Sequence, residues 1–162
     1  MRCNETPDLS SGEVERAYST ALRFLAYRPR SHQEVRKRLA RRFPAHAVQQ
    51  ALERLKERNY LDDAAFARFW RESREAHQPR SAAFIRRELE QRGVVRELAE
   101  DAVAGLDDDD SAYRAGHRRL RALQGLDEVT FHRRLGDYLR RRGFSFGVVR
   151  TTLKLLWEER EG

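Results

Sequence analysis

The chain has 162 residues, of which 40% are hydrophobic and 36% are charged, and its formal net charge at neutral pH is +7. This length fits one domain or a short array of small units, and so few apolar positions favour thin helical layers over one thick core. Cys3, the single cysteine, excludes an internal disulfide and a multi-cysteine metal site. No apolar run suits a signal peptide or a membrane span, so we expect a soluble cytoplasmic protein without a membrane partner.

Positive charge is carried almost entirely by arginine, because Lys37, Lys56 and Lys154 are the only lysines. The guanidinium group offers a planar fork of donors that binds carboxylate and phosphate in two places at once. A GC-rich genome would explain the choice of arginine over lysine, but not the excess of positive over negative charge. We therefore expect a partner rich in anionic groups, either a nucleic acid or an acidic protein surface.

Two stretches that begin fifty residues apart, YRPRSHQEVRKRL at 27–39 and HQPRSAAFIRREL at 77–89, share Pro-Arg-Ser and the spacing of the aliphatic residues that follow. A further step of fifty residues aligns a third copy, in which Phe131 replaces the serine. Glycine at a helix end adopts the left-handed conformation at no steric cost, so the glycines of the third aligned column predict helix ends. The aligned columns are Val35, Ile85 and Leu135; Leu39, Leu89 and Leu139; Phe43, Gly93 and Gly143; and Val48, Leu98 and Val148. Such self-similarity predicts a tandem repeat.

Each copy is predicted to form three helices, and no segment alternates as a strand would. The fold class that we expect is all-α, with three tandem three-helix repeats in an elongated, curved array. We predict a flexible tail over 1–12 and repeats over 13–60, 61–108 and 109–162. The helices are expected near 13–27, 32–42, 45–58, 63–77, 82–92, 95–105, 110–124, 128–142 and 146–160.

Local signals support the start of the second helix and the junctions. Ser31 and Glu34 predict a capping box, in which each residue bonds the backbone of the other. A unit of about fifty residues buries little surface alone, so neighbouring repeats are expected to share apolar faces. The aromatic residues Phe66, Phe69 and Trp70 are spaced for such a junction.

Basic residues gather on the middle helices of the first and third copies. On the helix near 32–42, Val35, Leu39 and Phe43 form an inward stripe, which leaves the basic side chains pointing outward or flanking it. The helix near 128–142 has a similar excess, with Asp137 as its only central acid. In the middle copy the negative charges of Glu88 and Glu90 offset the positive charges of Arg86 and Arg87. The candidate residues for binding an anionic partner are Arg30, Arg36, Lys37, Arg38, Arg41, Arg42, Arg86, Arg87, Arg133, Arg134, Arg140, Arg141 and Arg142.

No pattern of catalytic residues stands out. The histidines are scattered, Ser31 and Ser81 occupy helix-capping positions, and there is no glycine-rich phosphate loop. The acidic run 107–110 suits a helix N-terminus better than a cation site. RRRGFSF at 140–146 interleaves bases and aromatics as single-strand binders do, although we expect both phenylalanines to be packed. We expect a protein that is not an enzyme and has no cofactor or metal.

NYLDDAAFARFW, residues 59–70, resembles the signature of the RecX family of bacterial recombination regulators. RSHQEVRKRL at 30–39 and IRRELEQRGV at 85–94 are similar to further patterns of that family. The resemblance runs from about residue 15 to the end of the chain. Phe43-Pro44 departs from it, since the family usually has a Lys-Gly or similar pair there, and the third copy is poorly matched.

The resemblance implies a curved array of three-helix repeats that binds the RecA filament on single-stranded DNA. Such a protein lies in the filament groove, blocks filament extension, and restrains ATP hydrolysis, strand exchange and coprotease activity. It would act as a monomer in recombination, DNA repair and the SOS response, with DNA itself as a further partner. Asp62 and Asp63 belong to the signature, but we expect them to act as an N-cap and a first-turn acid.

Two other classes remain open. One is a stand-alone DNA-binding module of helix-turn-helix type, but such a module would carry its charge on the third helix of a unit rather than the second. The other is a structural adaptor, for which charge would matter little. Strong salt dependence of partner binding would argue against an adaptor.

Overall fold

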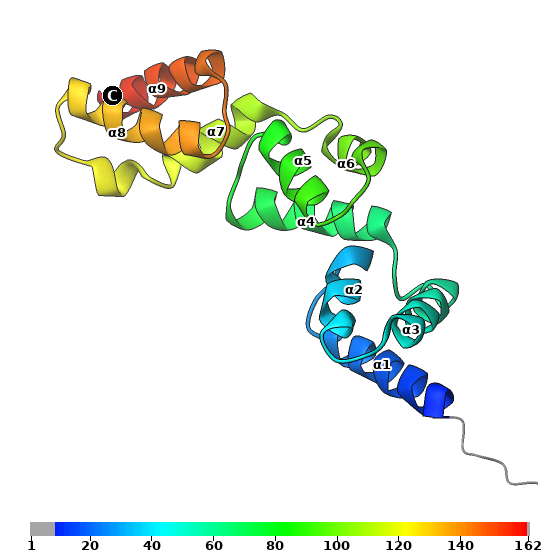
Figure 1. Ribbon diagram of the computed structural model, residues 1–162. Coiled ribbons are helices and arrows are strands. Elements are labelled where there is room, and N and C mark those ends of the chain that lie inside the picture. Colours follow the sequence, from blue (N-terminus) through cyan, green and yellow to red (C-terminus); the bar gives the residue numbers. More distant parts are fainter. Residues whose placement is uncertain (1–8, 162) are drawn as a thin grey trace, which may run out of the picture.

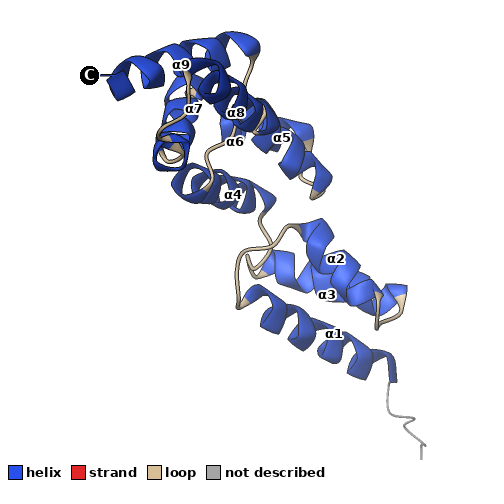
Figure 2. Ribbon diagram, turned by 90° about the vertical axis from the view of Figure 1, so that its left-hand side faces the viewer, coloured by secondary structure: helices blue, strands red, loops and turns tan. Residues whose placement is uncertain are grey.

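The computed structural model describes residues 9–161, which form nine α-helices, one short 3-10 helix and no strand (Figure 2). The elements are α1 (Leu9–Leu25), α2 (His32–Ala40), α3 (Ala45–Glu57), α4 (Asp63–His77), α5 (Ala82–Gln91), α6 (Arg96–Val103), α7 (Asp108–His117), η1 (Leu120–Leu123), α8 (Glu128–Arg141) and α9 (Phe146–Glu161). The expected all-α fold is confirmed. No helix within the described range is both long and apolar enough to cross a membrane.

The helices are grouped in threes, and the three groups follow one another along an elongated, bent body (Figure 1). In each group the third helix packs against both the first and the second. The first repeat, α1 to α3, lies at one end of the body and the third, α7 to α9, at the other. The curved array of three-helix repeats that the sequence predicts is therefore present.

Each repeat has a core of its own. The residues of the first two aligned columns are all completely buried: Val35, Leu39, Ile85, Leu89, Leu135 and Leu139. They belong to three separate apolar clusters, one in each repeat. Within the described residues no buried apolar cluster spans two repeats, so the expectation that neighbouring repeats share an apolar core was wrong. Phe66 is buried in the core of the second repeat, where Trp70 packs against it at 5.9 Å between ring centroids, while Phe69 is half-buried.

At the junction between the first two repeats, two hydrogen bonds each join a backbone group of one repeat to a side chain of the other. The buried hydroxyl of Ser31 donates to the carbonyl of Arg92 at 2.6 Å, and the amide of His32 donates to Oδ1 of Asp63 at 2.8 Å. The Pro-Arg-Ser turn of the first repeat therefore contacts the second repeat at two places, the end of α5 and the start of α4.

The second junction repeats this arrangement with one difference. The amide of Ser81, and not its hydroxyl, donates to the carbonyl of Arg142 at 3.1 Å. The amide of Ala82 donates to Oδ1 of Asp108 at 2.8 Å, as that of His32 does to Asp63. The Pro-Arg-Ser motif is thus repeated because each copy docks its repeat onto the next one.

The glycine column belongs to the same junctions. Gly143 has a φ of +88°, and a Cβ there would lie 2.6 Å from Oγ of Ser81. Gly93, with a φ of +81°, approaches the side chain of Gln33 just as closely. Gly93 lies against the first Pro-Arg-Ser turn and Gly143 against the second, and the chain has only these two turns. The equivalent position of the first repeat, Phe43, therefore has no such turn to contact and packs against the core of the first repeat.

Two helices differ from their predicted ranges by more than two residues at one end. Helix α1 begins at Leu9, inside the segment 1–12 expected as a flexible tail, and residues 1–8 lie outside the described range. The helix expected over 110–124 ends at His117 and continues as a turn and η1. There the Arg118 guanidinium donates to the carbonyls of Ala76 and His77, which ties the end of α7 to the end of α4. The predicted repeat boundaries, 13–60, 61–108 and 109–162, stay a prediction.

Candidate functional site

The start of α2 fixes the direction of its basic side chains. Oγ of Ser31 accepts a hydrogen bond from the Glu34 amide at 3.1 Å, and the Glu34 carboxylate accepts one from the Ser31 amide at 3.0 Å, so the predicted capping box is confirmed. Val35 and Leu39 then face the core. Since helical residues three and four apart share a face, the remaining positions must face outward. The basic residues that they expose, called the α2 cluster below, are Arg36, Lys37, Arg38, Arg41 and Arg42.

The α2 cluster has no internal counter-charge. Among the residues that the structure describes, no carboxylate lies within 4.0 Å of any of its five cationic groups, whereas other basic residues of the first repeat do have such partners. Arg28 pairs with Glu34 at 2.9 Å, and Arg54 pairs with Glu15. An exposed set of like charges without partners produces a positive surface potential that attracts anions.

The basic surface extends from the α2 cluster onto α1. Arg16 and Arg23, seven residues apart on α1, line with Arg42 and Phe43 a shallow cavity of about 450 Å³. These two arginines are absent from the residues that the sequence singled out. Their i, i+7 spacing places them on one face of a helix and could have identified them.

Two of the predicted binding residues are instead held by the fold. The guanidinium of Arg30 lies 4.1 Å over the ring of Phe24, and burial, together with the nearby charge of Arg28, lowers the pKa of Arg30. Arg142 donates to the carbonyl of Pro79 at 3.2 Å and lies 4.4 Å over the ring of Tyr138. Both side chains are half-buried at or near the turns that join the repeats.

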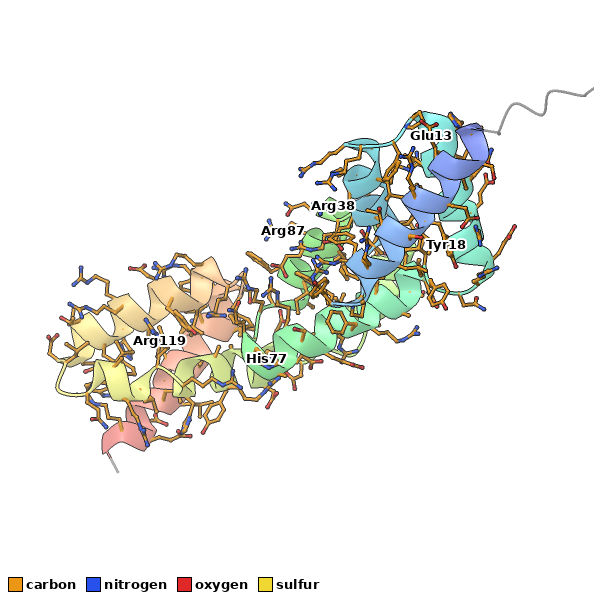
Figure 3. The ribbon with its side chains drawn as sticks, turned by 90° about the horizontal axis from the view of Figure 1, so that it is seen from below. Glu13, Tyr18, Arg38, His77, Arg87 and Arg119 are labelled. Atoms are coloured by element: carbon orange, nitrogen blue, oxygen red, sulfur yellow. The ribbon has the colours of Figure 1, made fainter. Side chains whose placement is uncertain are left out.

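On α5 the two adjacent arginines have different surroundings. Arg86 lies 3.9 Å from the Glu90 carboxylate and 3.4 Å from that of Glu100. Arg87 is exposed, and no described carboxylate lies within 4.0 Å of it. Figure 3 shows Arg87 on the same side of the body as Arg38 of the α2 cluster. Arg87 therefore extends the exposed basic surface from the first repeat to the second.

Glu88 does not neutralise α5 in the way its sequence position suggests. It is almost fully buried and accepts hydrogen bonds from Nε1 of Trp70 at 3.0 Å and from Arg74 at 2.8 Å. Arg92 lies 3.7 Å from the centroid of the Trp70 ring, and burial lowers the pKa of Arg92. Stacking on an aromatic ring stabilises a guanidinium that has lost water. Several arginines thus stabilise the interior.

On α8 the predicted candidates are exposed. Arg140 pairs with Asp137, whereas Arg133, Arg134 and Arg141 have no carboxylate within 4.0 Å in the described part of the chain. In the segment that follows, Phe144 is buried as expected, but Phe146 is 73% exposed, so the expectation that it is packed was wrong.

The acidic residues have structural roles at helix starts. Asp62 caps α4 by accepting from the Ala65 amide at 3.0 Å, and Asp107 caps α7 by accepting from the amides of Asp109 and Asp110. Within residues 9–161 no group of three or more histidine, cysteine or acidic side chains is placed to hold a metal ion. The expectation that the chain is not an enzyme stays a prediction.

Comparisons with known proteins agree with this geometry. Family models of the first, second and third three-helix domains of RecX match residues 17–55, 62–103 and 107–153. The chain is 35% identical to a regulatory protein RecX from Streptomyces coelicolor over 150 residues, which cover 90% of this chain and 80% of that relative. It is 33% identical to one from Prosthecochloris aestuarii over 146 residues, which cover 90% and 96%.

A crystal structure of RecX from Lactobacillus salivarius has the same fold, with a TM-score of 0.73 at 17% identity, over 90% of this chain and 97% of that one. A second RecX crystal structure matches 88% of this chain with the same TM-score at 22% identity. Three matched domains, close relatives over most of their length and a shared arrangement of helices lead to one conclusion. The chain belongs to the RecX family of regulatory proteins.

Proposed function

We propose that this chain is a negative regulator of recombination and of the SOS response, which binds the RecA filament on single-stranded DNA in its groove and blocks filament extension. It thereby restrains ATP hydrolysis, strand exchange and coprotease activity. It acts as a monomer in the cytoplasm, by binding and without catalysis. The proposal rests first on family membership, and the structural observation that supports it is the exposed α2 cluster without internal counter-charge.

The shape of the array supports binding along a filament. Three repeats with separate cores follow one another along an elongated body, a form that suits contact along a polymer (Figure 1). Exposed basic groups occur in every repeat, on α2, α5 and α8. A basic body of this kind is attracted over a long range to DNA phosphates and acidic protein patches, which raises its association rate.

The test is RecA ATP hydrolysis on single-stranded DNA, measured while this protein is added at increasing ratios to RecA. If the protein blocks extension at filament ends, inhibition should be complete at far fewer copies than one per RecA subunit. Inhibition that needs one copy per subunit would mean that the protein coats the filament. No effect at saturation would refute the proposed function.

A specific observation favours direct DNA contact as a second candidate. Phe146 is 73% exposed, and the guanidinium of Arg150 lies 6.0 Å from the centroid of its ring. Exposed aromatic side chains beside arginines stack with unpaired bases. A gel-shift assay with duplex, bare single strand and RecA-coated strand separates the candidates, because a stand-alone DNA-binding module should not prefer the coated strand.

A further inference from the structure

A cavity in the third repeat lies between the turn after α7 and the side of α8. Its volume is about 280 Å³. Three arginines, Arg119, Arg134 and Arg141, line it together with Asp137 and Tyr138, and Ala122, Leu123 and Leu135 also contribute to its walls. Arg119, labelled in Figure 3, belongs to none of the basic clusters considered above.

The end of α7 places Arg119 in this cavity. The amide of Arg119 donates to the carbonyl of Gly116 at 2.8 Å, which ends the α-helix with a tight turn. The neighbouring Arg118 is directed away and donates to the carbonyls of Ala76 and His77 of α4. The side chain of Arg119 instead extends toward α8, where its guanidinium lies 4.9 Å from the centroid of the Tyr138 ring.

Tyr138 is a fixed part of the cavity wall. Its ring also meets the guanidinium of Arg142, which lies 4.4 Å from the centroid and is itself held by a hydrogen bond to the Pro79 carbonyl. The wall is therefore connected to the junction between the second and third repeats. A positioned wall lowers the entropy lost when a ligand is bound.

The charge of the cavity is not balanced from within. No carboxylate of residues 9–161 lies within 4.0 Å of Arg119, Arg134 or Arg141, and the one acid of the lining, Asp137, pairs with Arg140. Guanidinium groups stay charged at any physiological pH. Three of them on one small cavity repel one another, and a bound anion would relieve this repulsion.

We propose that this cavity binds a phosphate group, with Arg119, Arg134 and Arg141 as its ligands. Guanidinium forks match phosphate oxygens in pairs, which makes phosphate a better partner than a single-point anion. A volume of about 280 Å³ lies below the range of cavities for drug-sized ligands, and suits one phosphate with part of its sugar. The group belongs either to a nucleic-acid backbone or to a free nucleotide.

The test compares two double variants that remove the same charge from the same part of the fold. Arg119→Gln with Arg141→Gln takes two arginines from the cavity lining. Arg121→Gln with Lys154→Gln takes two exposed cationic side chains from η1 and α9 that do not line it. Binding of a fluorescent oligothymidylate is measured by anisotropy, and binding of pyrophosphate, as the free-phosphate probe, by calorimetry. RecA is absent, so failure of the proposed function leaves this test intact.

The cavity variant should bind at least one probe about tenfold more weakly, and the control within about twofold of the parent chain. For the oligonucleotide, the slope of log affinity against log salt should fall by about 0.7 for each lost phosphate contact. Loss with the oligonucleotide alone assigns the site to a nucleic-acid backbone, and loss with pyrophosphate assigns it to a free nucleotide. Equal losses in both double variants, or none, would overturn the proposal, because the charge would then act diffusely.

A milder variant guards against misfolding of the double variant. Arg119→Lys keeps the charge but removes the fork, so it should weaken binding several-fold while the helical circular dichroism of the chain stays unchanged. If lysine supports full affinity for both probes, a point charge is enough and the proposed paired geometry is wrong.

Discussion

The hydroxyl of Ser31 donates a hydrogen bond of 2.6 Å to the backbone carbonyl of Arg92, across the junction between the first two repeats. The same oxygen accepts the amide of Glu34, so one buried side chain both starts α2 and holds the next repeat. Ser81 caps α5 through the amide of Phe84 at 3.1 Å, but reaches Arg142 with its backbone amide. Two serines in the same position of the repeat therefore have different roles.

Ser31→Ala should destabilise the chain more than Ser81→Ala. Each substitution removes an N-cap, which costs about 1 kcal/mol. Ser31→Ala also leaves the Arg92 carbonyl without its donor, for a total of about 2–3 kcal/mol. Urea unfolding followed by circular dichroism measures both. Equal losses would show that the bond between the repeats contributes nothing to stability.

Gly143→Ala should lower the free energy of unfolding more than Gly125→Ala, although both glycines have positive φ, +88° and +77°. A residue with a Cβ in this conformation costs about 1–2 kcal/mol. A Cβ at position 143 would in addition lie 2.6 Å from Oγ of Ser81 and 2.8 Å from Cβ of Phe84, whereas nothing lies within 4 Å of one at position 125.

The difference between the two glycine variants should be visible in shape as well as stability. Small-angle scattering of Gly143→Ala should show a changed angle between the second and third repeats, with a lower unfolding temperature. Gly125→Ala should lower the unfolding temperature less and leave the scattering curve unchanged. The same curve for both variants would mean that the junction adapts to a methyl group at no cost.

The sequence predicted the features that depend on local helical geometry. The spacing of Val35 and Leu39 identified the inward face, and the exposure of Lys37 and Arg38 followed from it. Periodicity does not say which helix covers an apolar face. For this reason the spacing of Phe66 suggested a junction between repeats, whereas Phe66 is buried in the core of its own repeat with residues of α5 and α6.

Features that arise from contacts between distant segments could not be predicted. Glu88 is next to Arg87 in the sequence but turns inward to Trp70 and Arg74. Nothing in the composition of 118–124 breaks a helix, and the tie between Arg118 and the end of α4 is visible only in the folded chain. The sequence did not identify Arg119 as a binding residue, because the position of its side chain depends on the end of α7 just before it.

Charge reversal on the α2 cluster should weaken inhibition of RecA without unfolding the chain. Four of its five side chains are reversed, and all four are exposed; only Arg38 meets a partly buried group, since its guanidinium lies 5.6 Å from the centroid of the Phe24 ring. Attraction to phosphates and acidic patches becomes repulsion, which should raise the concentration for half-inhibition of RecA ATP hydrolysis at least tenfold. The residues changed to glutamate are Arg36, Lys37, Arg38 and Arg41.

The control for this reversal applies the same change of charge to other exposed positions. Its four substitutions to glutamate are at Lys56, Arg58, Arg68 and Lys154. If net charge alone mattered, both variants would lose inhibition equally, and the α2 cluster would not be the contact surface. If the α2 variant still inhibited RecA as well as the parent chain, the α2 cluster would likewise be rejected as the contact surface.

The two adjacent arginines of α5 allow a direct comparison, because they carry the same charge on the same helix but differ in exposure and in their partners. Arg86 lies within 4.0 Å of Glu90 and Glu100, whereas Arg87 is exposed without a described carboxylate at that distance. Arg87→Gln should raise the concentration for half-inhibition of RecA several-fold. Arg86→Gln should change it less than twofold and cost at most about 1 kcal/mol of stability, since exposed ion pairs contribute little.

The loss of inhibition caused by Arg87→Gln should shrink as salt is raised, because screening weakens the contact that only the parent chain makes. A larger deficit for Arg86→Gln would place the contact on the other side of α5 and would contradict a basic surface that runs from Arg38 to Arg87.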